Sequence, residues 1–169
     1  MNNRKHLHFC LLFLAPIFAF SLQLNAQKEP GKKEQKLAQM QKLVEGRNFV
    51  FVAQYANPLG GRNINLTSLY DLKIYNDTIM AELPYFGRAF VAPINSTDGG
   101  INFTTTKFNY KVNPKKKGGW DISIEPKDGG DVREMFLSIS ESGYASLQVT
   151  SNNRQGIGFT GYLTSREKL

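Results

Sequence analysis

The sequence predicts a mainly β fold, an antiparallel β-barrel or sandwich of about eight strands with one N-terminal amphipathic helix. Three observations predict it. Apolar and polar residues alternate with a period of two through most of the chain after residue 47, as in strands with one buried face. Turn-forming residues separate the alternating runs at short intervals, as in sandwiches and barrels. No helical pattern of about 10–15 residues lies between the runs, so a parallel sheet of βαβ units is disfavoured.

One helix is expected, over residues 27–46. Leu37, Met40 and Val44 recur at helical spacing and form a single apolar stripe, and Gly46 provides a stop signal. The remaining faces are polar and carry five lysines, namely Lys28, Lys32, Lys33, Lys36 and Lys42. We expect this helix to cover an open end or an edge of the sheet with its lysines in solvent. Attachment to an anionic surface or polymer is the alternative.

Residues 47–169 are expected to form one antiparallel β domain. Its first run, residues 49–53, is apolar on both faces, as in a central strand. Asn76-Asp77 lies between two alternating runs and predicts a tight hairpin. The alternating runs that follow the first one are 70–75, 79–83, 101–103, 108–112, 120–124, 135–139, 145–149 and 157–163.

The first 26 residues have the three parts of a secretory signal peptide. Arg4 and Lys5 precede a mostly apolar run over residues 9–24, and Leu24-Asn25-Ala26 offers a cleavage site before Gln27. A retained membrane anchor is the alternative, but it needs about 20 apolar residues, and this run is shorter. We therefore expect a signal peptide over residues 1–26 and a product exported to the periplasm or cell envelope.

The histidines and the cysteine of the chain, His6, His8 and Cys10, all lie in this expected signal peptide. The exported product would therefore contain neither residue type. Disulfides, thiolate chemistry, zinc sites of the usual Cys/His type and an imidazole general base would then be excluded. We expect no cofactor and no metal site.

The chain is basic, with 21 Lys and Arg against 14 Asp and Glu and a formal net charge of +7. Cleavage after residue 26 would remove two positive charges and leave +5. Lys115-Lys116-Lys117 forms a basic hairpin tip, which is interpreted most simply as a solvated turn. Nucleic-acid binding needs a basic face with exposed aromatics, and the nearby Tyr110 and Trp120 are in phase with the core. We therefore expect no nucleic-acid partner and at most peripheral contact with anionic lipid head groups or polysaccharide.

The segment Leu-Pro-Tyr-Phe-Gly-Arg-Ala at residues 83–89 is the most distinctive stretch of the chain. Pro84 ends the preceding strand because it cannot donate to a ladder. Tyr85 and Phe86 place two rings beside Arg88, a combination suited to stacking on a sugar or binding an anion. These three residues are our candidate ligand contacts. The alternative is a structural corner in which the rings cap the core and Arg88 pairs with an acid such as Glu82.

This motif, an Arg-x-Phe opening strand (Arg47, Phe49) and a Gly-x-Ile-x-Phe strand with an extra Gly100 resemble a family of exported bacterial proteins. That family is classed only as a domain of unknown function. The resemblance covers most of residues 47–163 and implies an exported β-rich domain in a Gram-negative envelope. It implies no activity and no catalytic residue.

Taken together, these features favour a non-enzymatic binding or interaction module that holds a small apolar or glycan ligand in a mouth or cleft. A carboxylate-dependent hydrolase is one alternative, although nothing in the sequence brings two acids to a working separation. The acids expected on the solvent side of strands are Glu82, Asp121 and Glu125. A structural partner of another envelope protein is the third possibility.

Overall fold

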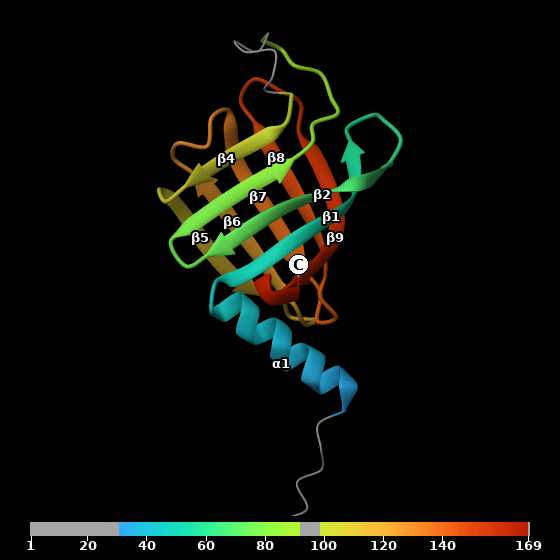
Figure 1. Cartoon of the computed structure of the whole chain (residues 1–169), viewed down its shortest axis with the longest axis vertical. Coiled ribbons are helices and arrows are strands. Elements are labelled where there is room, and N and C mark those ends of the chain that lie inside the picture. The colour runs from blue at the N-terminus through green and yellow to red at the C-terminus, as the bar shows by residue number, and fades with distance from the viewer. Residues whose placement is uncertain (1–30, 92–98, 169) are drawn as a thin grey trace, which may run out of the picture.

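The computed structural model describes residues 31–91 and 99–168, which form one α-helix, nine strands and a short 3₁₀ turn (Figure 1). The expected signal peptide lies outside these residues. Helix α1 spans Lys32–Glu45 and the 3₁₀ turn spans Arg166–Lys168. The strands are β1 (Asn48–Pro58), β2 (Ile64–Tyr75), β3 (Thr78–Leu83), β4 (Ile101–Thr105), β5 (Phe108–Pro114), β6 (Trp120–Pro126), β7 (Val132–Ile139), β8 (Tyr144–Ser151) and β9 (Ile157–Thr164).

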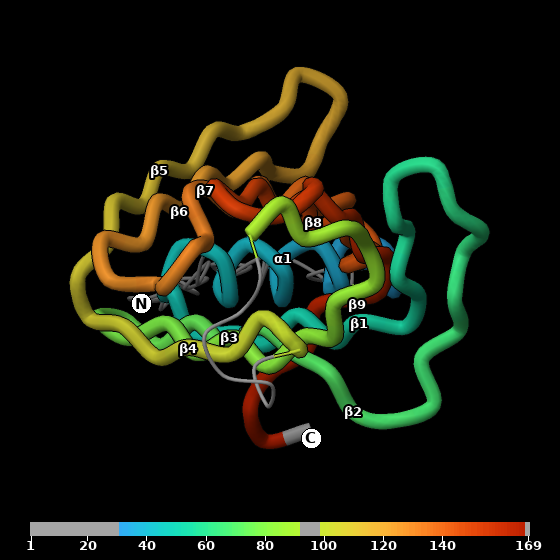
Figure 2. The backbone as a smooth tube through the Cα atoms, turned by 90° about the horizontal axis from the view of Figure 1, so that it is seen from above, coloured from blue at the N-terminus to red at the C-terminus, as the bar shows by residue number. Residues whose placement is uncertain are grey.

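All nine described strands belong to one antiparallel sheet in the order β4-β3-β2-β1-β9-β8-β7-β6-β5. The sheet curls into a nearly closed barrel, with β1 to β4 on one side and β5 to β8 on the other (Figures 1 and 2). The expectation of a mainly β, antiparallel barrel or sandwich is confirmed, and the architecture is the barrel. The strands number nine in the described part of the chain, against the expected eight or so.

The two edge strands, β4 and β5, follow each other in the chain and are joined by residues 106–107 (Figure 2). The β6–β7 turn holds this corner. The Thr105 hydroxyl donates to the Asp128 carboxylate, and the Lys127 amide donates to the Lys107 carbonyl at 2.8 Å. The gap between the edges is therefore bridged by hydrogen bonds at one end.

Side chains fill the interior of the barrel. The register pairs Phe51 of β1 with Leu72 of β2, and Leu72 with Ala81 of β3, so the apolar positions of successive strands point to the same side. The largest fully buried side chains are Phe49, Phe51, Phe159, Met40, Leu72, Ile74, Ile79, Leu83, Ile101, Ile122, Ile124 and Met135. A small barrel has an interior that its own side chains can fill, and this one is filled by them.

Helix α1 covers one open end of the barrel, as its apolar stripe predicts (Figures 1 and 2). Met40 and Val44 are fully buried in the core. A Cβ at Gly143, in the β7–β8 turn, would lie 2.7 Å from the Met40 sulfur, so a residue without a side chain lets the turn meet the helix. The helix begins at Lys32, and residues 27–30 of the predicted range lie outside the described part. No helix within residues 31–91 and 99–168 is long and apolar enough to cross a bilayer.

Strand β1 contains a bulge that the sequence pattern did not reveal. Its register with both neighbours shifts between Ala53 and Tyr55. Against β9, Gln54 is the extra residue of a bulge, whereas against β2 the additional residues, 66–69, belong to β2. Ala53 pairs with Gly161 and is buried, whereas Tyr55 pairs with Thr160 and faces outward. In an unbroken strand Tyr55 would occupy the next, inward position, so the bulge turns its ring from the core to the surface.

Candidate functional site

The loop of residues 84–91 lies at the end of the barrel opposite α1 (Figure 1). Tyr85, one of the predicted ligand contacts, is half-buried and held in place. Its hydroxyl donates to the backbone carbonyls of Arg88 at 2.9 Å and Gln155 at 3.1 Å. Burial raises the pKa of the Tyr85 phenol above its ordinary value, against the opposing charge of the Arg154 guanidinium. These are contacts that stabilise the loop.

Arg154, in the β8–β9 loop, connects the segments at this end. Its guanidinium lies 4.7 Å from the centre of the Tyr85 ring. The Nε and Nη2 atoms donate to the two Asp131 carboxylate oxygens at 2.7 and 2.6 Å, and Nη1 donates to the Gly100 carbonyl at 2.9 Å. The Phe90 amide also donates to the Asn153 carbonyl at 2.8 Å. Tyr85 therefore belongs to a network that ties four chain segments together.

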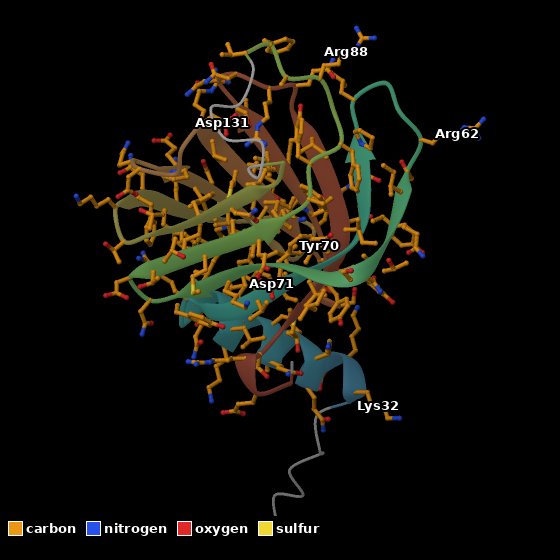
Figure 3. All side chains as sticks on the ribbon, turned by 45° about the horizontal axis from the view of Figure 1, so that its top comes forward. Lys32, Arg62, Tyr70, Asp71, Arg88 and Asp131 are labelled. Carbon is orange, nitrogen blue, oxygen red and sulfur yellow. The ribbon has the colours of Figure 1, made fainter. Side chains whose placement is uncertain are left out.

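The other two predicted contacts, Phe86 and Arg88, are exposed, and the Arg88 side chain points away from the barrel (Figure 3). Phe90 and Val91 beside them are also exposed. Among the described residues, no ion pair joins Arg88 to Glu82, the pairing that the sequence left open. The role of Tyr85, Phe86 and Arg88 in ligand binding stays a prediction.

A row of polar side chains crosses the outer face of the barrel at right angles to the strands. Register pairs connect Tyr55 of β1 to Thr160, Thr160 to Ser146, Ser146 to Ser138 and Ser138 to Asp121 of β6. All five residues are exposed or half-buried, on the side away from the core. Because most of these side chains are small, they leave a shallow groove, and their hydroxyls supply donors and acceptors along it.

Aromatic rings stand on both sides of this row. Tyr144 of β8 and Tyr162 of β9 are register partners on one side, with 70% and 38% of their surface exposed. Phe136 of β7, paired with Gln148, stands on the other side and is 42% exposed. Tyr55 is 46% exposed at the β1 end of the row. Exposed aromatics gathered around polar groups are typical of binding surfaces.

We call this depression the tyrosine groove. Its volume is about 460 Å³. It is lined by Gln54, Tyr55, Lys115, Ser138, Ser140, Tyr144, Ala145, Ser146, Thr160 and Gly161. Ala145 and Gly161 are register partners, so part of its floor consists of small residues and backbone.

Lys115, Ser138 and Asp121 form a hydrogen-bonded chain in and beside the groove. The Lys115 ammonium donates to the Ser138 hydroxyl at 3.0 Å, and that hydroxyl donates to the Asp121 carboxylate at 2.7 Å. Lys115 Nζ also lies 3.7 Å from Asp121 Oδ1. A Ser–Lys hydrolase needs an amine that accepts the serine proton. Here the serine proton goes to a carboxylate and the lysine is a donor, so the arrangement suits ligand hydrogen bonding better than acyl transfer.

Two pairs of acids come close enough to share a groove elsewhere on the outer face. Asp71 and Glu82 are register partners on β2 and β3 and line a groove of about 280 Å³. Asp71 is only 2% exposed, and its Oδ2 lies 3.1 Å from Lys73 Nζ. Glu125 and Glu134 line a second groove of about 410 Å³.

In the second pair, Glu125 accepts a hydrogen bond from Asn109 and Glu134 accepts one from Ser123, both at 3.0 Å. In the first pair, Asp71 offers little of its carboxylate to a substrate. Within residues 31–91 and 99–168, no group of three or more His, Cys, Asp or Glu residues is placed to hold a metal ion. The acids therefore give weaker support to a hydrolase than the tyrosine groove gives to a binding protein.

The sequence contained a signal for part of this groove. Tyr144 and Tyr162 occupy the polar phase of otherwise alternating strands, and an aromatic residue in that phase indicates an exposed ring. Tyr55 carried no such signal, because its orientation depends on the bulge at Gln54. The polar row was hidden for the same reason, since strand register is not readable from one sequence.

Comparison with known proteins is consistent with this fold. The family model of DUF4251, a domain of unknown function, matches residues 31–163. No curated protein matches the chain. A crystal structure of a DUF4251 family protein from Bacteroides eggerthii superposes with a TM-score of 0.59 at 16% sequence identity, covering 80% of this chain and 91% of that one. The likeness extends to the fold alone, and the family resemblance seen in the sequence is confirmed.

Proposed function

The chain belongs to the DUF4251 family, a domain of unknown function, and we propose that it is a non-enzymatic binding module that holds a glycan in the tyrosine groove. The single observation that carries this proposal is the bulge that places Tyr55 on the outer face, at the end of a hydroxyl-lined row flanked by Tyr144. The proposal includes export to the periplasm or cell envelope, supported by the signal-peptide pattern of residues 1–26.

The chemistry of the groove fits a sugar chain. Tyrosine provides a large, rigid, amphipathic contact surface at a low entropic cost, and serine provides adaptable hydrogen bonding. A sugar ring needs both, because it has apolar C–H faces and a rim of hydroxyls. The shallow, open groove suits an extended chain of rings that enters and leaves along the row. A purely apolar ligand is less well supported, because the interior of the barrel is filled by side chains.

The test is a binding titration of the purified protein against a panel of neutral and acidic polysaccharides, by affinity gel electrophoresis and calorimetry. We expect Tyr144→Ala and Tyr55→Ala each to weaken binding by about tenfold, roughly 1.4 kcal/mol, because contact rings of this kind dominate binding surfaces. Phe90→Ala is the matched control, since it removes an equally exposed ring at the end opposite α1.

Two results would contradict the proposal: no member of the panel retards the native protein, or binding persists unchanged in both tyrosine variants. The same titration of Phe86→Ala and Arg88→Ala tests the loop contacts predicted from the sequence. Release of reducing ends during incubation would favour a hydrolase, and we expect none.

The proposed export has a test of its own. N-terminal sequencing of the protein purified from the periplasm should show Gln27 as its first residue.

A further inference from the structure

Two lysine-rich segments that are far apart in the sequence meet at the α1 end of the barrel. Lys33 and Lys36 of α1 line a groove of about 410 Å³ together with Lys117 of the β5–β6 turn. We call it the lysine groove. Its remaining lining residues are Gly118, Ser140, Glu141 and Ser142.

The lysine groove has an excess of positive charge. Glu141 is the acid among its lining residues, and Glu141 Oε2 lies 3.9 Å from Lys33 Nζ. Lys36 and Lys117 form no ion pair within the described part of the chain. The hydroxyls of Ser140 and Ser142 lie 3.0 Å apart at its edge, and the Ser140 hydroxyl donates to the Tyr144 carbonyl at 2.9 Å. Clustered ammonium groups recognise anionic groups such as carboxylate, sulfate or phosphate.

The two grooves are continuous. Ser140 lines both of them, and Tyr144 follows four residues later at the start of β8. The turn that carries Lys115 and Lys117 contributes one lysine to each groove. A chain of sugar rings that lies across the tyrosine groove would therefore reach the lysine groove at the end nearest α1.

On the basis of the proposed function, we infer that the ligand is an anionic polysaccharide. Its rings would contact Tyr55 and Tyr144, and its acidic groups would pair with Lys33, Lys36 and Lys117. The tyrosines supply affinity for the sugar, and the lysines supply the preference for a charged over a neutral chain. The positive charge of both segments, which the sequence favoured as solvated faces with attachment to an anionic surface or polymer as the alternative, then has a single use.

The experiment compares polysaccharides that share a backbone and differ in charge: polygalacturonate against its methyl ester, and carboxymethyl-dextran against dextran. Binding is measured at 0.15 M NaCl, where charges more than about 8 Å apart are largely screened. We expect the native protein to prefer the charged member of a pair by about tenfold or more. A triple variant, Lys33→Gln with Lys36→Gln and Lys117→Gln, should lose this preference and keep its affinity for the neutral member.

A second triple variant, Lys107→Gln with Lys111→Gln and Lys127→Gln, removes the same charge away from both grooves and should behave as the native protein. Equal losses in the two triple variants would overturn the inference and leave the proposed function intact. Binding weakened about tenfold in Tyr144→Ala, with the charge preference abolished only in the first triple variant, supports both the proposed function and the inference. Phosphatidylglycerol vesicles bound through the three lysines, with no polysaccharide bound, would overturn the inference and assign this end to a membrane surface.

Discussion

Arg154 shows how much one side chain determines at the end of the barrel opposite α1. It forms a two-point ion pair with Asp131 in which both side chains are mostly buried, at 14% and 20% exposure. The same guanidinium covers the Tyr85 ring and donates to the Gly100 carbonyl. A planar, permanently charged donor with several N–H groups can make these contacts together, and a lysine cannot.

We predict that Arg154→Ala lowers the free energy of unfolding by about 2–3 kcal/mol, because it leaves the Asp131 carboxylate partly buried without its partner. Urea denaturation followed by circular dichroism measures this. Arg154→Lys should recover little, since it cannot reproduce the two-point pair. Arg88→Ala is the control and should change the stability by less than about 0.5 kcal/mol, because the Tyr85 hydroxyl binds the Arg88 backbone carbonyl, which the substitution keeps.

Tyr110 on β5 provides a pH-dependent test at the same scale. Burial raises its pKa to about 12, with the Arg47 guanidinium 4.7 Å from the ring centre opposing the shift. The unfolded chain loses this proton near pH 10, while the folded protein keeps it until about pH 12. The unfolded state therefore binds fewer protons in that range, and the stability contributed by the neutral phenol falls as the pH rises.

We expect the midpoint of urea unfolding to fall between pH 10 and pH 12, and to fall less steeply in Tyr110→Phe. At pH 7 the variant should be as stable as the native protein or slightly more stable, because the buried Tyr110 hydroxyl has no hydrogen-bond partner in the described structure. An identical pH profile for the two proteins would show that the phenol titrates alike in the folded and unfolded states.

At the scale of elements, strand β1 carries both the core and the proposed site. Its residues before the bulge, Phe49 to Ala53, are buried, and after the bulge Tyr55 is exposed while Ala56 is buried again. The extra residue thus changes which face each later side chain occupies. Close approach at this point requires Gly161 on β9, where a Cβ would lie 1.9 Å from the Val52 carbonyl oxygen.

Gly161→Ala should therefore destabilise the protein by about 3 kcal/mol or more, because the clash is with backbone atoms that cannot rotate away. Thermal unfolding followed by circular dichroism provides the measurement. Gly99→Ala is the control, since no atom lies within 4 Å of the position a Cβ would take there. If Gly161→Ala had the same melting temperature as the native protein, β1 and β9 would have to be farther apart than described.

The alternation of side chains was sufficient to predict most of these elements. Runs such as Trp120, Ile122 and Ile124 have inward residues at every second position, and the structure buries them. Asn76 takes a positive φ of 44° in the hairpin turn that Asn76-Asp77 predicted. The groove was not predictable, because it depends on the register of five strands and on a bulge that alternation cannot locate. Arg154 was likewise invisible, since its partners Asp131 and Gly100 lie 23 and 54 residues away.

On the scale of the whole molecule, side chains fill the interior of the barrel and the proposed binding surface lies on its exterior. One end is covered by α1 through Met40 and Val44, and the 84–91 loop and its Arg154 network lie at the other. Each end is held by segments distant in sequence, and the core side chains of the described residues are buried. Binding is then expected on the outer face, where the tyrosine and lysine grooves are connected through Ser140.

This arrangement predicts how the protein responds to an apolar probe. The fluorescent dye N-phenyl-1-naphthylamine should show no saturable binding to the native protein, because side chains fill the core within residues 31–91 and 99–168. Met40→Ala should open a cavity beneath α1 and lower the free energy of unfolding by about 2–4 kcal/mol. Lys42→Ala, on the exposed side of the same helix, is the control and should leave the stability nearly unchanged. Saturable dye binding to the native protein, displaced by a long-chain fatty acid, would place the ligand inside the barrel and count against the outer groove.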